Sequence, residues 1–257
     1  MKKFYKKLLA VIVCAVVSLG ALDVYATNEY SWYIKRHGHE LPEFPENAEV
    51  LSRYNAYCVD FEAHDNQEKI IYLTFDAGYE NGNVEKILNT LDAESVPAAF
   101  FLLDNIILKN TDLVIKMKEN GHLVCNHTKN HKNLSKSSEE EISENLKSLE
   151  KLYEENTGYK MDMYFRFPEG KYSIEALECI NKLGYKTVFW SFAYDDWDNG
   201  RQMNKEKAMK KILDHTHEGA IILLHPTSST NAEILPDLIR EWKSRGYRFG
   251  TLDELTK

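Results

Sequence analysis

Two histidines four residues apart form the first group in this sequence that could bind a metal ion. His127 and His131 flank the tripeptide Thr-Lys-Asn, and at this spacing both imidazoles lie on one face if the segment is helical. Imidazole nitrogens are common ligands of zinc and other divalent ions. A chain with nine histidines also shows this spacing by chance, so the weight of the pair depends on its place in the fold.

Other residue types suited to proton transfer are spread along the chain. Asp76 follows an apolar run and could act as a general base or metal ligand, although an aspartate that caps a turn is the commoner role. His225 directly follows another apolar run, where either an acid catalyst or a hydrogen-bonded structural histidine is expected. Arg166 could orient a carboxylate. Asp196 precedes Trp197 in an acidic segment that suits a sugar-binding wall.

These candidates follow a regular alternation of predicted strands and helices. Apolar residues at three- and four-residue steps predict helices near 84–91, 139–152, 174–183 and 235–242. Short β-rich runs predict the strands Ile70–Phe75, Ala98–Leu103, His122–Asn126, Met163–Arg166, Lys186–Phe192, Ala220–Leu224 and Tyr247–Thr251. The alternation favours parallel strands with right-handed crossovers, and about seven strands suggest an α/β fold with a distorted, incomplete (β/α) barrel. Catalytic residues are then expected at the carboxyl ends of the strands, where all the candidates lie.

Two helix ends carry recognisable capping signals. Ser138 and Glu141 match a capping box at the start of the second helix. Gly184 is placed to end the third helix in a left-handed conformation. These apolar helix faces and capping signals indicate core packing rather than ligand binding.

Taken in order, the motifs resemble those of the NodB-homology polysaccharide deacetylases, carbohydrate esterase family 4. The matching segments are Thr74-Phe75-Asp76, His127-Thr128-x-x-His131, Arg166-x-Pro168-x-Gly170, Asp196-Trp197 and Leu223-x-His225. The resemblance covers about residues 67–257. It implies a hydrolase that removes N-acetyl groups from polymeric amino sugars with the help of a divalent metal ion, for which zinc is the first expectation.

The resemblance also implies a role for each matching residue. His127 and His131 would be the metal ligands, with Asp76 as a further candidate. Asp76 would be the general base and His225 the general acid that protonates the departing amine. Arg166 would hold Asp76, and Asp196 would tune His225. Substrate contacts would come from Tyr79, Pro168, Gly170, Trp197 and Leu223.

The sequence departs from the usual family pattern at four positions. Phe167 and Glu169 stand where proline and arginine are usual, and the loss of a basic residue there bears on contact with an anionic muramic substrate. The other two departures bear on the metal site. Ala77 stands where most members have an aspartate that ligates the metal, and Ala193 stands where an acidic residue is usual. We therefore expect weak metal binding, completed by water, by Asp76 or by Glu80. The segments 74–82 and 189–194, with Trp32-Tyr33, are similar to the muramic-δ-lactam-forming peptidoglycan deacetylases of endospore-forming bacteria.

That subgroup implies N-acetylmuramic acid of stem-free spore cortex peptidoglycan as the substrate. Its free lactyl carboxylate requires a polar partner, and Lys171 is the candidate. Two alternatives remain: deacetylation of N-acetylglucosamine in peptidoglycan or chitin-type oligomers, and an inactive glycan-binding module. The complete proton-transfer set speaks against the inactive module, because binding alone requires no such set.

The amino-terminal segment predicts export. Four lysines precede an apolar run that is shorter than a membrane span usually needs, so residues 1–26 are expected to be a cleaved signal peptide. Residues 27–66 are expected to be an extension wrapped on the main domain, 67–257. The peptidoglycan partner would then be met outside the cytoplasmic membrane, in the cell wall or spore cortex, by a secreted monomer without a stable membrane span.

Charge and cysteine content exclude other classes. The formal charge is −8, and residues 1–26 carry four lysines and one aspartate, so the rest of the chain carries −11. Such an acidic body repels phosphate backbones, and we expect no nucleic acid partner. Three cysteines follow residue 26 and none forms a C-x-x-C pair. They are expected to be buried free thiols.

Overall fold

The computed structural model describes residues 28–257 of the chain, and the predicted signal peptide lies outside them. Within this range, no helix is long and apolar enough to cross a membrane. The three cysteines of this range, Cys58, Cys125 and Cys179, are free and buried, as predicted.

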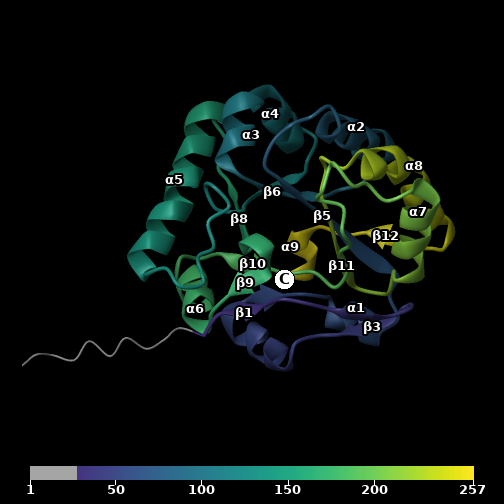
Figure 1. The fold of residues 1–257 in the computed structure, drawn as a ribbon, viewed down its shortest axis with the longest axis horizontal. Coiled ribbons are helices and arrows are strands. Elements are labelled where there is room, and N and C mark those ends of the chain that lie inside the picture. Colours follow the sequence, from purple (N-terminus) through teal and green to yellow (C-terminus); the bar gives the residue numbers. More distant parts are fainter. Residues whose placement is uncertain (1–27) are drawn as a thin grey trace, which may run out of the picture.

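The centre of the molecule is a curled parallel sheet, as predicted from the strand and helix alternation (Figure 1). The order of neighbouring strands is β11-β5-β6-β7-β8-β10-β4, and β12 pairs with β5. The strands span β4 Ala56–Tyr57, β5 Ile70–Ala77, β6 Ala99–Leu102, β7 Leu123–Asn126, β8 Asp162–Phe165, β10 Lys186–Val188, β11 Ala220–Leu224 and β12 Arg248–Phe249. All these pairings are parallel, so the carboxyl ends of the strands meet at one edge.

Alternation along the strands separates an inner and an outer core. In β5, Ile71, Leu73 and Phe75 join the large cluster that packs against the outer helices. Tyr72 of the same strand belongs to a second cluster, which takes buried residues from most strands of the sheet and fills the inside of the barrel. Asp76 continues this inward-facing series at the end of β5. The strand pattern therefore aims the carboxylate into the barrel mouth.

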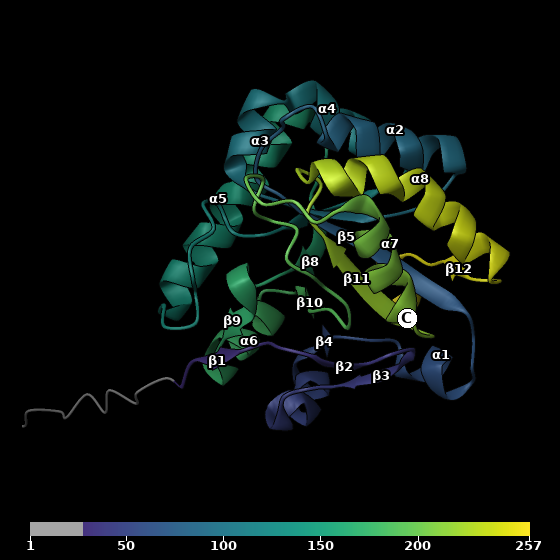
Figure 2. The same cartoon turned by 45° about the vertical axis from the view of Figure 1, so that its right-hand side comes forward.

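Helices cover the outside of the sheet, with α2 packed on α8 and α5 on α6 (Figure 2). They span α1 Phe61–Asp65, α2 Val84–Glu94, α3 Asp104–Lys109, α4 Thr111–Glu119, α5 Glu139–Thr157, α6 Ile174–Lys182, α7 Lys205–Asp214, α8 Ser229–Ser244 and α9 Leu252–Leu255. The Ser138–Glu141 capping box of α5 is present. Gly184 follows α6 at φ 88°, the left-handed conformation expected of it.

Several boundaries differ from the predicted ones. The strand predicted for 186–192 ends at Val188, because the chain then bends toward β11 and the amides of Ser191 and Phe192 both bond to the Ile221 carbonyl. The last large helix begins at Ser229 instead of near residue 235. Helices α3, α4 and α7 were not predicted.

The amino-terminal extension is part of the barrel sheet as well as wrapped around it. Its strand β4 pairs with β10, and Val59 bridges to Ala220 of β11. Its first strand, β1 (Tyr30–Ser31), pairs with β9 (Lys171–Tyr172), while β2 (Lys35–His37) and β3 (Glu40–Glu43) form a separate hairpin. The 3-10 helix η1 (Glu46–Tyr54) connects this hairpin to β4. Residues 28–66 thus close the distorted side of the barrel.

Candidate active site

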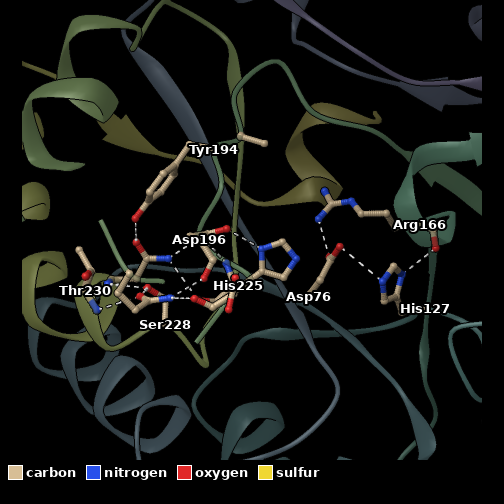
Figure 3. Close-up of polar contacts among 12 residues, drawn as sticks. Asp76, His127, Arg166, Tyr194, Asp196, His225, Ser228 and Thr230 are labelled. Atoms are coloured by element: carbon tan, nitrogen blue, oxygen red, sulfur yellow. Dashed lines mark hydrogen bonds and ion pairs between the residues drawn. The ribbon is translucent and has the colours of Figure 1, made fainter. Parts of the chain in front are cut away.

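The carboxyl ends of the strands bring the predicted chemistry together in one cavity of about 620 Å³. Figure 3 shows Asp76 between His225 on one side and Arg166 and His127 on the other. The cavity is lined by Asp76, His127, His131, Phe167, Glu169, Trp190, Ala193, Tyr194, Trp197, Leu223 and His225. Adjoining it is a smaller pocket of about 180 Å³ that shares Asp76, both histidines of the His-x-x-x-His motif, Trp197 and His225.

Asp76 is held by a fully buried arginine. Nη1 of Arg166 lies 2.8 Å from Oδ1 of Asp76, and Arg166 Nη2 donates to the hydroxyl of Thr74. Burial disfavours the charged carboxylate, but the Arg166 guanidinium, with His127 and His225, outweighs it and holds the pKa of Asp76 below its usual value. Asp76 is therefore an ionised, oriented proton acceptor at neutral pH.

The imidazole of His127 faces Asp76 with one ring nitrogen and is held by a hydrogen bond at the other. Its Nδ1 lies 2.8 Å from the carbonyl oxygen of Arg166, so Nδ1 carries the proton and donates it. Its Nε2, 3.5 Å from Oδ2 of Asp76, is left with a free lone pair. Burial lowers the pKa of His127 to about 4, against the opposing effect of Asp76, so the imidazole is neutral at physiological pH. This is the state a metal-binding histidine requires.

His131 reaches the site through a turn instead of a helix. The segment after β7 is irregular, and both Thr128 (φ 70°) and His131 (φ 59°) adopt left-handed backbone conformations. The two imidazole centroids of His127 and His131 are 5.1 Å apart with the rings nearly perpendicular. The pair is brought together as predicted, but the helical geometry considered for it is absent.

His225 is paired with Asp196 on the opposite side of the cavity. Nδ1 of His225 lies 2.7 Å from Oδ1 of Asp196, and the backbone amide of His225 donates to Oδ2. Burial would lower the pKa of His225, but the Asp196 carboxylate more than offsets this and raises it above its usual value. Because Nδ1 faces the carboxylate, Nε2 is the nitrogen left to act in the cavity.

The residues predicted to contact substrate fall into two groups. Trp197 and Leu223 line the larger cavity, and Tyr79 lines the smaller pocket, where its hydroxyl meets the Asn199 amide. Pro168 and Gly170 line neither cavity, and their contact with substrate stays a prediction. They form the short 3-10 turn η2 (Pro168–Gly170) that carries Glu169.

Gly170 is required by close packing. It has φ 65°, and a Cβ there would lie 2.9 Å from both the Trp190 ring and Cβ of Trp32. The indole of Trp32 in turn donates to the Trp190 carbonyl and stacks on Phe189. The extension thereby supports the Trp190 wall of the cavity.

Several lining residues lie within the quoted motifs but were assigned no role from the sequence. Phe167, Trp190 and Tyr194 add aromatic surface, and Glu169 adds an acidic side chain. The Lys171 ammonium contacts the Glu169 carboxylate, and Lys171 does not itself line the cavity. Only tertiary packing shows that these side chains face the cavity.

The donor set offers two imidazoles and the Asp76 carboxylate to a metal ion. Among the described residues, however, no group of three or more His, Cys, Asp or Glu is placed so that it could hold a metal ion, so these three side chains do not form a ready-made site. Ala77 lines the smaller pocket without supplying a ligand. Glu80, the other considered ligand, is turned to the amides of Gly82 and Glu85 at the start of α2. The neutral His127 with its free Nε2 therefore fits an open site with few protein ligands.

Comparison with known proteins identifies the family. The family model described as polysaccharide deacetylase matches residues 63–188. Peptidoglycan-N-acetylmuramic acid deacetylase PdaA of Bacillus subtilis is 36% identical over 250 residues, which cover 95% of this chain and 94% of that protein. The chain belongs to the polysaccharide deacetylases of carbohydrate esterase family 4. It is thus a hydrolase, as its motifs indicated.

Two further comparisons relate this polysaccharide deacetylase to others in the family. The solved structure of Bacillus subtilis PdaA, a family 4 carbohydrate esterase, matches with a TM-score of 0.83 at 35% identity, over 88% of this chain and 96% of that one. A peptidoglycan-N-acetylglucosamine deacetylase of Bacillus cereus is 32% identical over 201 residues, or 75% of this polysaccharide deacetylase and 90% of that protein.

A larger cavity of about 850 Å³ lies elsewhere in the fold. It is lined by residues of η1, β4 and the start of α1, together with Leu255. None of the candidate catalytic residues lines it, so the deacetylase chemistry is assigned to the 620 Å³ cavity at the strand ends.

Proposed function

We propose that the protein removes the acetyl group from N-acetylmuramic acid in peptidoglycan whose peptide stems have been cleaved off. The observation that carries this proposal is the extent of the similarity to PdaA. That similarity covers 95% of the chain, which includes residues of the extension that supports the Trp190 wall. The similarity to the N-acetylglucosamine deacetylase covers 75%.

In this proposal the reaction is an amide hydrolysis with two proton transfers. The oxygen of a water molecule bonds to the acetyl carbonyl carbon while Asp76 accepts the water proton. The carbon–nitrogen bond then breaks while Nε2 of His225 donates its proton to the nitrogen. Acetate and a free amine leave. The amine can afterwards close a lactam with the lactyl carboxylate of the same sugar, the product expected in spore cortex.

The supporting residues keep both catalytic groups in the required states. Arg166 holds Asp76 ionised and oriented, and Asp196 favours the protonated form of His225. Opposite shifts of an acid and a base in one cavity are typical of such a pair. The aromatic side chains of Trp190 and Trp197 offer apolar surface to the sugar rings.

We include a divalent ion, with zinc as the first candidate, as part of this function. His127 and His131 would hold it, and Asp76 is the remaining protein ligand within the same cavity. When bound, the ion would polarise the acetamide carbonyl. With only two imidazoles dedicated to it, we expect readily reversible binding.

A second candidate substrate is N-acetylglucosamine of the same polymer. Glu169 favours it, because an acidic side chain in the cavity opposes the lactyl carboxylate of muramic acid. The cavity-lining residues described above include no lysine or arginine. Lys171, bound to Glu169, is the cation that the muramic acid proposal assigns to the lactyl group.

Mass spectrometry of treated glycan strands tests the proposal. Stem-free strands would be incubated with the protein and added divalent ions, digested to disaccharides and fragmented to locate the lost acetyl group. We expect loss from the muramic residue, and none with the Asp76→Asn variant. Loss from the glucosamine residue would instead support the second candidate. No acetate release from either sugar would support an inactive glycan-binding module.

A further inference from the structure

Behind the His225–Asp196 pair lies a buried asparagine whose polar atoms are all engaged with the site. Asn231 is in the first turn of α8 and is 1% exposed. Its Nδ2 lies 2.6 Å from Oδ2 of Asp196 and 3.1 Å from the carbonyl oxygen of His225. Both amide hydrogens are therefore used on the two residues of the pair.

The orientation of the Asn231 amide is itself fixed. The hydroxyl of Tyr194 donates to Oδ1 of Asn231, so Nδ2 must face Asp196. The backbone amide of Asn231 donates to Oγ of Ser228, the residue that caps α8. Figure 3 shows this network on the side of Asp196 away from Asp76.

The loop that carries Asp196 is fastened to the same helix end. Oγ of Ser228 donates to Oε1 of Gln202, and Nε2 of Gln202 donates to the backbone carbonyls of Asp196 and Asp198. The Asp196 loop and the first turn of α8 thus form one hydrogen-bonded unit. A carboxylate inside such a unit has a single orientation toward its histidine.

We propose that Asn231 is a positioning residue that locks Asp196 and thereby fixes which nitrogen of His225 carries the proton in the neutral state. This inference rests on the proposed role of His225 as the acid. A neutral histidine in water favours the Nε2–H tautomer, whereas Asp196 accepts a hydrogen bond only from Nδ1–H. Oδ1 of Asp196 stays aimed at Nδ1 because His225 N and Asn231 Nδ2 hold Oδ2.

The role is specific to the proton-transfer side of the cavity. The other charged groups that face His225 are Asp76 and Arg166, and Asn231 has no hydrogen bond to either. Loss of Asn231 should therefore reduce turnover without changing how the glycan binds. A residue with a purely structural role would lower stability and leave the tautomer unchanged.

Nitrogen-15 NMR of the histidine-labelled full chain tests the inference, with the His225 signals assigned by their loss in His225→Gln. At a pH where His225 is neutral, we expect the wild type to show the Nδ1–H tautomer. The Asn231→Leu variant keeps the side-chain volume without the donors, and it should show a clear share of the Nε2–H tautomer. Its kcat should fall about tenfold with KM within twofold of wild type, since removal of one charged hydrogen bond costs on this order.

Two further variants make the result decisive. Tyr194→Phe removes only the hydroxyl that orients the amide. It should shift the tautomer in the same direction, and it keeps the inference testable if Asn231→Leu does not fold. Thr230→Val is the matched control, because its buried hydroxyl in the same turn donates to the carbonyl of Met203 and not to Asp196. It should lower stability without changing the tautomer.

Unchanged tautomers in both Asn231→Leu and Tyr194→Phe would overturn the inference. The NMR measurement needs no substrate. Absence of deacetylase activity in the wild type would therefore refute the proposed function while the assignment of Asn231 is decided separately.

Discussion

The guanidinium of Arg166 and the carboxylate of Asp76 form a pair in which the arginine is completely buried and the aspartate nearly so, with Nη1 and Oδ1 2.8 Å apart. Arg166 also donates from Nε to the carbonyl of Val188, and its guanidinium carbon lies 4.2 Å from the ring centroid of Phe101. The pair therefore ties β5, β6, β8 and β10 together below the cavity. It holds the candidate base in its charged form.

Replacement of Arg166 by methionine should leave Asp76 as an unpaired buried charge. We expect the free energy of unfolding at pH 7 to fall by about 3–5 kcal/mol, the usual cost of breaking a buried pair. The pKa of Asp76 is lowered in the wild type, so its stabilising contribution is present above the unfolded pKa of about 4 and is lost as the pH falls through the folded value. Without Arg166, burial should raise the pKa of Asp76 instead, so acidification to pH 4 neutralises the unpaired charge in the variant and the difference between wild type and variant shrinks.

Denaturant unfolding at pH 7 and pH 4 measures this difference. Addition of Asp76→Asn to the methionine variant serves as the control, because it removes the unpaired charge and should recover much of the loss. Equal destabilisation at both pH values would contradict the assignment of the cost to the Asp76 charge.

His225 should act in its protonated form. Its pKa is raised above the usual value of about 6.5, so kcat/KM should fall as the pH rises through this raised value. His225→Ala should lower turnover about 10²–10⁴-fold, the usual contribution of a general acid, and should abolish this limb of the profile. A pH series of acetate release from both proteins measures it, with His37→Gln in the exposed hairpin as the control. A folded His225→Ala variant with near wild-type turnover would rule out the acid role.

Metal should be easily removed from this site and easily returned. Chelators should abolish activity, and added divalent ions should restore it, because only two imidazoles are dedicated to the ion. In calorimetric titration with Zn²⁺, His127→Ala should bind more weakly than wild type, and Ala77→Asp should bind more tightly.

Ala77→Asn is the matched control for the metal experiment, since it adds a similar volume at a fully buried position without a carboxylate. Equal Zn²⁺ affinity in wild type and His127→Ala would refute the assignment of His127 as a ligand.

The Glu169–Lys171 pair should report the charge of the substrate. With stem-free muramic acid glycan, Glu169→Gln should lower KM several-fold and Lys171→Gln should raise it, because one removes a repulsive charge and the other an attractive one. With an uncharged N-acetylglucosamine oligomer, neither substitution should change KM appreciably. Steady-state kinetics on the two glycans separates the cases, and identical responses on both would argue against a contact with the lactyl group.

The sequence predicts those site residues that lie at the ends of strands. Asp76 lies at the end of β5, and Arg166 and His225 directly follow β8 and β11, and a parallel sheet collects such residues at one edge. The backbone of His131 was not predictable, because a left-handed conformation at a non-glycine residue leaves no mark in the sequence. Asn231 was missed for a related reason, since its role depends on how α8 packs against a distant loop.

The parts of the fold that escaped prediction are short or weakly patterned. Strand β4 has only two residues, too few for alternation to be recognised. Helix α7 buries only Ala208, Ile212 and Leu213, and most of its other residues are lysines. Its apolar stripe is therefore too sparse to predict a helix.

Closure of the barrel by β4 has a consequence for how the chain acquires its structure. Ala56 pairs with Thr187 and Val59 with Ala220, so the earliest strand of the sheet finds its neighbours only after most of the polypeptide is available. Contacts between such distant segments form slowly because a long loop must first be closed. We expect the Trp190 wall, which Trp32 supports, to be completed in the same late event. We therefore expect assembly of the catalytic cavity to be coupled to a late step of folding, and a chain cut short before β11 to have neither a closed barrel nor a finished site.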